Sequence, residues 1–287
     1  MKLIHRIFDR KGTPVLTVVF VTLFLLEGNR ALRKRKLSRA SRVVVNALVS
    51  VPAFTLLRFI LLPVLVQLAR KSAGTGIGLN HRYQAPRSVK GLIAFLLLDY
   101  TNYLWHILNH KLPILWRFHL VHHTDPDLDV STALRFHFGE LIGSVFYRGF
   151  CVFAIGASPF TVLLYEILFE TATQFHHSNL RLTYQLEKRL NKVIVTPRMH
   201  GIHHSVEKHQ ADSNYSVIFS FWDRLHKTAL LNVPQQSIVT GSANYLDHTE
   251  LTVQFLLRLP FSKIRTGDTE SSFQPSQWEQ RRNMLAE

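Results

Sequence analysis

The sequence predicts an all-α, polytopic membrane protein in which membrane hairpins carry a cytosolic, histidine-rich helical cap. Two observations support this fold class. Apolar stretches recur along the first 175 residues, and 47% of the 287 residues are hydrophobic. Sixteen histidines gather in short motifs near the ends of those stretches. Charged residues make up 18% of the chain, below the roughly 25% typical of soluble domains, so a disordered charged protein is excluded.

Residues 13–26 form the first apolar segment, which is short for a membrane span of about 20 residues. A signal peptide would contain a similar segment, but the basic run RALRKRKLSRASR follows instead of a small-residue cleavage site. Such a run is typical of a cytoplasmic anchor. We therefore expect an uncleaved anchor span and a basic loop over residues 1–42. Residues 43–69 predict a second span, which Pro52 and Pro63 either kink or break.

Residues 89–105 predict a third span, and residues 141–175 are apolar apart from the sequence Gly-Ala-Ser-Pro at 156–159. Ser158 is suited to cap a helix and Pro159 to occupy its first position. We expect two helices of about 16 residues joined by a tight turn. Because each is short for an upright span, they predict a membrane hairpin that enters and leaves on one side. A buried hairpin of a soluble protein is the alternative.

This order of spans places every histidine-rich segment at the cytoplasmic face if residues 28–42 are cytoplasmic. The loop at 70–90 departs from the positive-inside rule, because it carries five Lys or Arg residues and would lie outside. We expect one main domain over residues 43–230. A polar C-terminal region follows over residues 231–287, and its residues 262–287 have no apolar periodicity and are interpreted as a surface tail.

Four clusters contain most of the histidines. On a helix, residues i and i+4, or i, i+3 and i+4, project from one face, so HxxxH presents two imidazoles and each HxxHH presents three. The second HxxHH follows Thr196 and Pro197, which together are a helix-start signal. The clusters are His106 and His110; His119, His122 and His123; His176 and His177; and His200, His203 and His204, with His137 alone between the second and third.

Grouped neutral imidazoles are the commonest metal ligands, and nitrogen donors suit zinc, copper, nickel or iron rather than magnesium or calcium. A structural zinc site needs four ligands. These motifs supply eight or nine, which indicates two metals with some open positions. A merely polar membrane surface is the alternative, but two HxxHH motifs at one expected face argue against it. Single histidines such as His248 are interpreted as ordinary polar residues, whereas His209 stays open because it follows the last motif closely.

Three acidic residues lie within apolar stretches, where an ionised group is costly and usually functional: Asp99, Glu166 and Glu170. On the expected helix, Glu166, Glu170 and His177 share a face. A carboxylate that accepts the second imidazole N–H fixes the orientation and tautomer of the ring. We expect Asp99 and Glu170 in that role, whereas Glu166 could equally pair with Arg148 across the hairpin.

Three stretches together resemble the fatty acid hydroxylase/sterol desaturase superfamily: residues 99–140, 175–180 and 195–225. They contain HxxxH, HxxHH, RFH, HSN and TPxxHxxHH in that order. The superfamily comprises integral membrane enzymes with a histidine-rich non-haem di-iron centre that use dioxygen to hydroxylate or desaturate lipids. The chain departs from the family pattern at Ile107, at Phe138 and in the ending WDRLHKT, which leaves the subfamily open but removes no expected ligand.

The resemblance implies two iron ions, O2 as co-substrate and a lipid as substrate. Carried over by position, the implied metal ligands are His106, His110, His119, His122, His123, His177, His200, His203 and His204, with His137 in or beside the site. Asn179 and Asn214 match asparagines typical of the family, and we expect them to support the ligands. Because neutral ligands leave the charge of two Fe(II) ions uncompensated, Asp99, Glu140 or the buried glutamates are expected to offset part of it.

Electrons must come from a separate donor, because the chain has no GxGxxG motif and its one cysteine, Cys151, cannot form a cluster. A reductase with ferredoxin or cytochrome b5 as carrier is implied. The 34 Lys and Arg against 19 Asp and Glu give a net charge of +15. This charge could dock an acidic carrier, but cytoplasmic loops and anionic lipid heads explain it more simply. No motif indicates nucleic-acid binding.

A bacterial inner membrane is favoured over the endoplasmic reticulum, since the chain is compact and carries no fused cytochrome b5 domain. The alternative function is a non-oxidative zinc protein of the membrane, either a lipid hydrolase or a metal-binding or transport protein. A metalloprotease would need HExxH, whereas Ile107 follows the first histidine. A transporter would place its ligands along a path through the bilayer rather than at one face.

Overall fold

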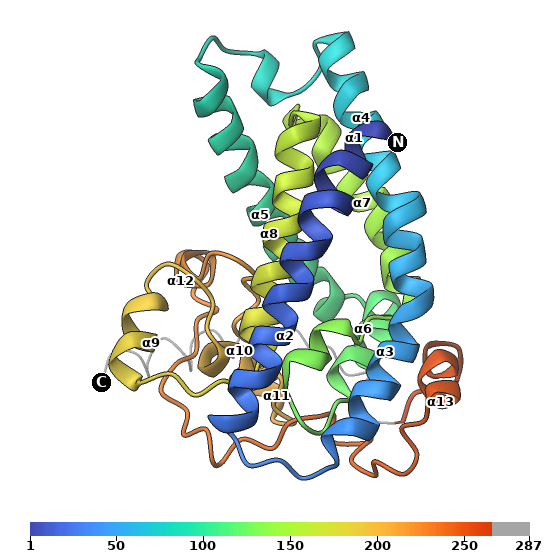
Figure 1. Cartoon of the computed structure of the whole chain (residues 1–287), viewed down its shortest axis with the longest axis vertical. Coiled ribbons are helices and arrows are strands. Elements are labelled where there is room, and N and C mark those ends of the chain that lie inside the picture. The colour runs from blue at the N-terminus through green and yellow to red at the C-terminus, as the bar shows by residue number, and fades with distance from the viewer. Residues whose placement is uncertain (266–287) are drawn as a thin grey trace.

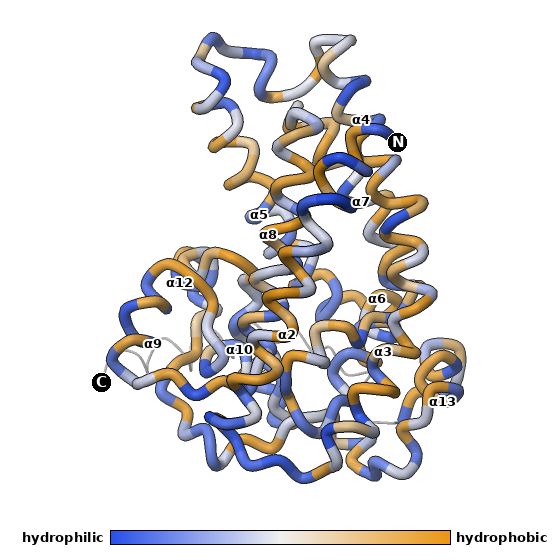
Figure 2. Tube along the Cα trace, viewed as in Figure 1, coloured by the Kyte–Doolittle hydropathy of each residue, from blue (hydrophilic) through white to orange (hydrophobic). Residues whose placement is uncertain are grey.

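The computed structural model describes residues 1–265, which form helices and loops with no β-strand among them. Long helices make an upright bundle, and shorter helices form a cap at one end of it (Figure 1). Apolar residues cover much of the bundle (Figure 2). Four segments are long and apolar enough to cross a membrane: Lys2–Asn29, Arg39–His81, Arg87–Lys111 and Phe138–Ile155. The predicted all-α fold class is confirmed, and the chain is a multi-pass membrane protein.

The N-terminal helix is longer than the apolar segment that predicted it. α1 (Lys2–Ile4) and the π-helical η1 (His5–Gly12) run without a break into α2 (Thr13–Asn29). Gly12 allows the helix to approach α8 closely, because a Cβ at this position would lie 2.7 Å from the side chain of Ile167. The polar residues before the apolar segment therefore extend the helix.

The second span is continuous, which decides between the kinked and broken spans left open by its prolines. α3 (Arg39–Leu56) passes through the π-helical turn η2 (Leu57–Leu61) into α4 (Leu62–Thr75). Pro52 lies inside α3 and Pro63 near the start of α4, and neither can donate a helical hydrogen bond. The wide turn between the two prolines keeps the helix unbroken.

The hairpin is built from α7 (Phe138–Ile155) and α8 (Pro159–His177) and packs beside α5 (Arg87–Lys111). Its turn has the predicted chemistry: the Ser158 hydroxyl accepts the Thr161 N–H at 3.0 Å, and Pro159 begins α8. Gly156 ends α7 with a φ of +72°. The turn lies against the connection between α4 and α5, where a Cβ on Gly78 would meet Gly156 at 2.8 Å.

The bundle core lies at the contact of α4 with the hairpin. Leu61, Leu62 and Leu65 are fully buried there, and they belong to one apolar cluster with Val152 of α7 and Leu163 of α8. Each such side chain contributes roughly 1.5–3 kcal/mol when it is buried away from water. Because these side chains come from three helices, their burial fixes the hairpin against α4.

The remaining helices are mostly one or two turns long, and all of them except η3 form the cap. They are η3 (Leu79–His81) at the far end of the bundle and, in the cap itself, α6 (Pro113–His123), η4 (Val130–Leu134), α9 (Tyr184–Leu190), α10 (Pro197–His203), α11 (Lys208–Ala211), α12 (Phe221–Leu225), α13 (Val253–Arg258) and η5 (Leu259–Phe261). The C-terminal region predicted as polar is partly apolar: Leu256 of α13 is buried in a cluster with Val49, Leu120 and Val121. Residues 266–287 of the predicted tail lie outside the described residues.

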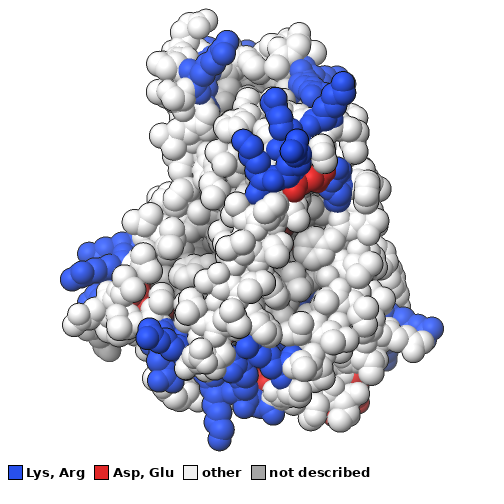
Figure 3. Space-filling model, in the orientation of Figure 1, with Lys and Arg blue, Asp and Glu red and all other residues white. Residues whose placement is uncertain are grey.

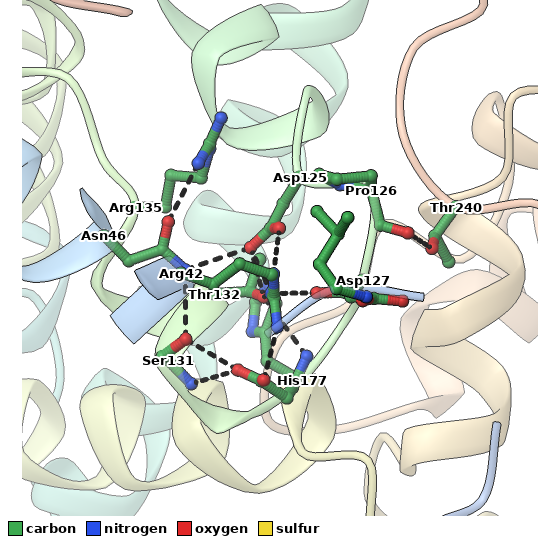
Figure 4. A network of polar contacts seen from close by, with 12 residues as sticks. Arg42, Asn46, Asp125, Pro126, Asp127, Ser131, Thr132, Arg135, His177 and Thr240 are labelled. Carbon is green, nitrogen blue, oxygen red and sulfur yellow. Dashed lines mark hydrogen bonds and ion pairs between the residues drawn. The ribbon is translucent and has the colours of Figure 1, made fainter. Parts of the chain in front are cut away.

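A buried polar network joins the first turns of α3 to the loop that follows α6 (Figure 4). Arg42 donates from Nε and Nη2 to the two carboxylate oxygens of Asp125 at 3.0 and 2.7 Å, and from Nη1 to Asp129 at 2.5 Å. Asn46 donates to Asp125 at 3.0 Å and accepts from Arg135 at 2.9 Å. Although burial opposes ionisation, the guanidiniums of Arg42 and Arg135 lower the pKa of Asp125 to about 2.

Replacing Arg42 with methionine should lower the free energy of unfolding by about 3–5 kcal/mol, because two buried carboxylates lose their shared counter-charge. Unfolding of the metal-free protein in detergent measures this effect without a contribution from metal binding. Arg70→Met, an exposed change at the far end of the same continuous span, is the control and should alter stability by less than about 0.5 kcal/mol. A similar small change for both variants would contradict the role of the network.

Candidate metal centre

Nine buried or nearly buried histidines form two adjacent groups in the cap. Within each group, one nitrogen from every ring lies within 4.8 Å of the others. The ring centres of His123 and His204, one from each group, are 4.5 Å apart. The first group is His106, His110, His119, His123 and His203, and the second is His122, His177, His200 and His204. All nine histidines that the sequence predicted as ligands are therefore brought together.

Helical spacing explains how each HxxHH motif contributes to both groups. His119 and His123 are four residues apart on α6 and belong to the first group, whereas His122 turns to the second. In α10 and the residue after it, His200 and His204 belong to the second group. Residues four apart share a stripe of a helix, and a neighbour one residue away lies about 100° around it. Each motif therefore lies between the two groups.

Backbone carbonyls fix the tautomer of four candidate ligands. A carbonyl oxygen can only accept, so the Nδ1 atom carries the proton and the Nε2 lone pair is left for the interior of the group. The Nδ1–H donors are His106 to Tyr215 at 2.7 Å, His203 to Ser213 at 2.7 Å, His177 to Thr173 at 2.7 Å and His122 to Arg135 at 3.3 Å. The sequence offered no signal for these acceptors, because they are main-chain atoms.

Glu140 supplies the one carboxylate that contacts a candidate ligand within residues 1–265. Its Oε2 accepts from His119 Nδ1 at 3.2 Å, and its Oε1 accepts from Asn109 at 3.3 Å. Glu140 lies in the first turn of α7, where the helix dipole favours a negative charge. The geometry matches the expectation that this residue offsets positive charge at the site.

Several ring nitrogens in the first group have no hydrogen-bond partner in the described part of the chain. The Nε2 atoms of His110, His119, His123 and His203 are all buried in this condition. A buried nitrogen without a partner costs about 1–3 kcal/mol, so these four atoms need a common acceptor of their lone pairs. A metal cation would meet that need.

The Nε2 atoms of the second group converge on one point. His177 Nε2 lies 2.9 Å from that of His122, 3.0 Å from that of His200 and 3.2 Å from that of His204. Nitrogens bound to one metal at about 2.1 Å in tetrahedral geometry lie about 3.4 Å apart. The second group therefore has nearly the spacing of a four-nitrogen metal site, and both donor sets fit a metal ion.

The protonation of the cap histidines also fits metal binding. Burial, followed by the neighbouring imidazoles, lowers the pKa values of His122, His123, His200 and His204 well below the ordinary value. Burial lowers the pKa of His203 to about 3. These rings are neutral at physiological pH, which is the state in which imidazole binds metals.

His137 is not brought into either group. Its Nδ1 accepts the Gly139 N–H at 3.0 Å and thereby caps α7, while its Nε2 donates to the Leu257 carbonyl at 3.2 Å. Both ring nitrogens are thus used in holding the start of α7 against α13. His176, which the sequence did not predict as a ligand, lies with its ring centre 4.1 Å from that of His200 and donates from Nδ1 to Val217 at 3.1 Å.

Asp99 and Glu170 make no direct contact with a candidate ligand. Asp99 accepts from Trp222 Nε1 at 2.8 Å and from the Phe219 N–H at 3.2 Å. These bonds anchor the segment around residues 219–222 to α5. Glu170 is partly buried on α8, one turn beyond Glu166, which pairs with Arg148. The pairing of Glu166 across the hairpin is thus present, and the side chain of Glu170 makes no hydrogen bond within residues 1–265.

The two asparagines position loops rather than rings. Asn179 accepts the Arg33 N–H at 2.8 Å and donates to the Arg33 carbonyl at 2.9 Å, which holds the basic loop beneath His177. Asn214 has a left-handed φ of +56° and donates to the carbonyls of Met199 and Leu230 at 2.9 and 2.7 Å. Because Asn214 lies between the carbonyls that hold His203 and His106, it supports the ligands indirectly.

A small cavity of about 50 Å³ reaches both groups. Its wall contains His106 and His119 of the first group and His122, His177 and His200 of the second, and His176 also faces it. The remaining wall includes the apolar side chains of Trp105, Phe136, Phe169 and Val217. The cavity offers one apolar space in which a small molecule or a short alkyl segment can meet both candidate metal sites.

Comparison with known proteins agrees with this geometry. The family model for fatty acid hydroxylases matches residues 91–228. The chain is 30% identical to human alkylglycerol monooxygenase over 56% of its length and 35% of that protein's. It is 26% identical to rat cholesterol 25-hydroxylase over 55% and 53% of the two chains, and 28% identical to ornithine lipid hydroxylase OlsE of Rhizobium tropici over 50% and 42%. No solved structure matches the chain.

The fold and the site define a multi-pass membrane protein with a buried, histidine-rich centre whose donor atoms fit metal ions. Residues 91–228, just under half of the chain, are similar to the fatty acid hydroxylase family. It spans about half or less of the length of the three relatives above. By name, these relatives are an alkylglycerol monooxygenase, a cholesterol hydroxylase and an ornithine lipid hydroxylase.

His204→Ala should lower the bound metal from two ions per chain towards one, because only the second group loses a donor. His203→Ala should have the complementary effect on the first group. Metal analysis of protein purified without oxygen measures both. His248→Ala, on an exposed loop, is the control and should keep the full metal content. Full occupancy in both site variants would contradict the two-group assignment.

Glu140→Gln should weaken metal binding by about 10–100-fold, because the neutral amide accepts more weakly from His119 and leaves more positive charge uncompensated. Competition with a chelator measures the change. The exposed Glu207→Gln variant carries the same substitution at a side chain that contacts no candidate ligand within residues 1–265, and it should bind metal as tightly as the wild type. Equal affinities for the two variants would remove Glu140 from the centre.

Proposed function

We propose that this protein is a membrane-bound non-haem di-iron oxidoreductase that uses O2 and external electrons to hydroxylate a lipid C–H bond. The observation that carries the proposal is the pair of histidine groups beside one shared apolar cavity. A pair of iron ions held there would supply the activation of dioxygen. The shared cavity supports a reaction in which both ions act on one substrate.

Iron is favoured over zinc by the surroundings of the donors. A zinc hydrolase needs a carboxylate or similar base free to activate water beside the metal. Within residues 1–265, Glu140 is the one carboxylate in the cavity wall, and its two oxygens accept from His119 and Asn109, so its position serves to orient a candidate ligand. A closed structural zinc site would need four ligands and no access, whereas this centre has nine candidate ligands and a cavity. Metal analysis of the purified protein distinguishes the iron proposal from the zinc alternative.

The protein's own side chains orient the substrate and exclude water. Trp105, Phe136 and Phe169 give the cavity an apolar wall that suits an alkyl segment and disfavours bulk water. The carbonyls of Ser213 and Tyr215 keep the rings of His203 and His106 in place during turnover. Because the cavity is small, we infer that a slim part of the lipid enters it.

The relatives favour hydroxylation over desaturation, since their names describe a monooxygenase and hydroxylases. Those names specify an alkylglycerol, cholesterol and an ornithine lipid. All three are lipids, but they belong to different classes, so the names do not select one class of substrate. We propose a fatty acyl, sterol or related lipid that enters from the bilayer. A separate donor, ferredoxin or cytochrome b5 with a reductase, would supply the electrons.

We place the centre at the cytoplasmic face of a bacterial inner membrane. The basic loop that follows α2 supports this orientation, because it is bound to the cap through Asn179 and Asp127, which accepts the Lys36 and Leu37 N–H groups at 2.9 and 2.7 Å. Lys and Arg side chains gather at both ends of the molecule (Figure 3). The cap orientation therefore rests on the loop beside the site rather than on the total charge.

The decisive experiment measures metal and product together. Protein purified without oxygen should contain two irons per chain and, with lipid extract and a reducing system, should incorporate one atom of labelled dioxygen into a lipid. Lipid profiles of cells with and without the gene would then identify the substrate. One zinc per chain with hydrolysis of a lipid, and no label in the product, would overturn the proposal.

Filling the cavity should abolish turnover without removing metal. Thr173→Leu adds apolar bulk to a side chain that lines the cavity, and we expect product formation to fall at least tenfold while metal content stays near two. Thr171→Leu makes the same change on α8 at a residue that does not line the cavity. This control should retain most activity, and an equal loss in both variants would argue against the cavity as the reaction site.

A further inference from the structure

A second and larger cavity lies at the opposite end of the bundle from the histidines. It has a volume of about 770 Å³ and is lined by the start of α5, the start of α8 and the connection between α4 and α5. The first turns of α5 lean away from the hairpin at this end of the molecule (Figure 1). This cavity belongs neither to the metal centre nor to its entrance, and the reaction proposed above does not use it.

One side of the cavity is apolar and open. Leu92 of α5 is 60% exposed, and Phe160, Leu164 and Leu168 of α8 are 58%, 37% and 40% exposed. All four line the cavity on helices of the membrane bundle. Apolar side chains that are exposed on membrane helices pack against acyl chains, so the open side fits the tail of a lipid.

The mouth of the cavity is basic. Arg87 and Lys90 line it, and no Asp or Glu occurs anywhere between residues 28 and 98. Arg87 has no ion pair or hydrogen bond within residues 1–265. Lys90 is held in position, because its carbonyl accepts from Asn80 at 3.0 Å and its ammonium lies 5.2 Å from the centre of the Tyr83 ring. Two cations without a counter-charge fit an anionic group.

The start of α5 adds to this positive potential. The helix begins at Arg87 after Pro86, its first turn contains no acidic residue and no side chain caps it. The first N–H groups of a helix lack helical acceptors and favour an anion. Ser88, in the same turn, also lines the cavity. A phosphate at the mouth would meet these groups while its chains follow α5 and α8.

The second cavity ends before it reaches the metal centre. Phe95 forms its inner wall, and its ring packs against those of Tyr165 and Phe219 at 5.3 and 6.2 Å. One turn further along α5, Asp99 accepts a hydrogen bond from the Phe219 N–H and holds Phe219 against this helix. A lipid in this cavity therefore stops short of the space lined by Trp105 and the histidines.

We propose that this cavity is a binding site for one phospholipid with an anionic headgroup. The phosphate lies at Arg87 and Lys90, and an acyl chain lies along Leu92, Leu164 and Leu168. The site is independent of the proposed reaction, because the packed aromatic rings separate it from the metal centre. It is also present whether or not the centre holds metal, so its test needs no turnover.

Native mass spectrometry of the full chain tests the proposal, with phosphatidylglycerol and phosphatidylcholine of identical acyl chains as probes. We expect one phosphatidylglycerol per chain to stay bound, at least tenfold in excess of phosphatidylcholine. Arg87→Gln/Lys90→Gln should remove that preference. Arg70→Gln/Lys71→Gln removes two exposed positive charges at the same end but outside the cavity, and it should keep the preference.

A variant of the apolar wall tests the position of the chain. Leu164→Trp adds bulk inside the cavity and should reduce the binding of both lipids, with helix content by circular dichroism unchanged. Retention of phosphatidylglycerol by Arg87→Gln/Lys90→Gln would overturn the proposal. An equal loss in the Arg70→Gln/Lys71→Gln control would also overturn it, because the attraction would then be a general effect of charge.

Discussion

The structure depends on the burial of nine neutral imidazoles whose lone pairs face one another. Such an arrangement is unfavourable without a cation, because the Nε2 atoms of four rings in the first group have left water and have no hydrogen-bond partner within residues 1–265. The cap organises around this constraint. Main-chain carbonyls at Ser213, Tyr215 and Thr173 take up the opposite ring nitrogens, so that the free lone pairs point inward. Metal binding therefore adds to the stability of the folded cap.

Charge is balanced at a distance from the rings. Arg42 neutralises Asp125 and Asp129 at the base of α3, and Glu27 of α2 accepts the main-chain N–H groups of Val130 and Asn179 at 3.1 and 2.7 Å. These buried carboxylates join the first two spans to the loops that carry ligands. The membrane helices thus hold the cap through polar contacts at the end of the bundle, while apolar packing of α4 with the hairpin holds the helices together.

The sequence predicted those features that depend on local pattern. The cap of α8 at Ser158, the helix start at Thr196 and the sharing of one face by histidines four residues apart all follow from short-range rules. It did not predict that neighbouring histidines of one HxxHH serve different groups, because this depends on how two helices meet. The acceptors of the ring N–H groups are carbonyls, which have no residue signature. Asp99 and His137 were expected at the site on type and position, yet their partners are a tryptophan, main-chain N–H groups and a distant carbonyl.

The position of α13 late in the chain has a consequence for biosynthesis. α13 packs Leu256 against Val49 of α3 and against Leu120 and Val121, the residues that immediately precede the paired histidines of α6. The helix bearing the first HxxHH thus acquires its outer wall from residues that leave the ribosome more than a hundred positions later. Until that segment emerges, the apolar side of α6 is uncovered, so the cap closes around this helix only after α13 has been synthesised.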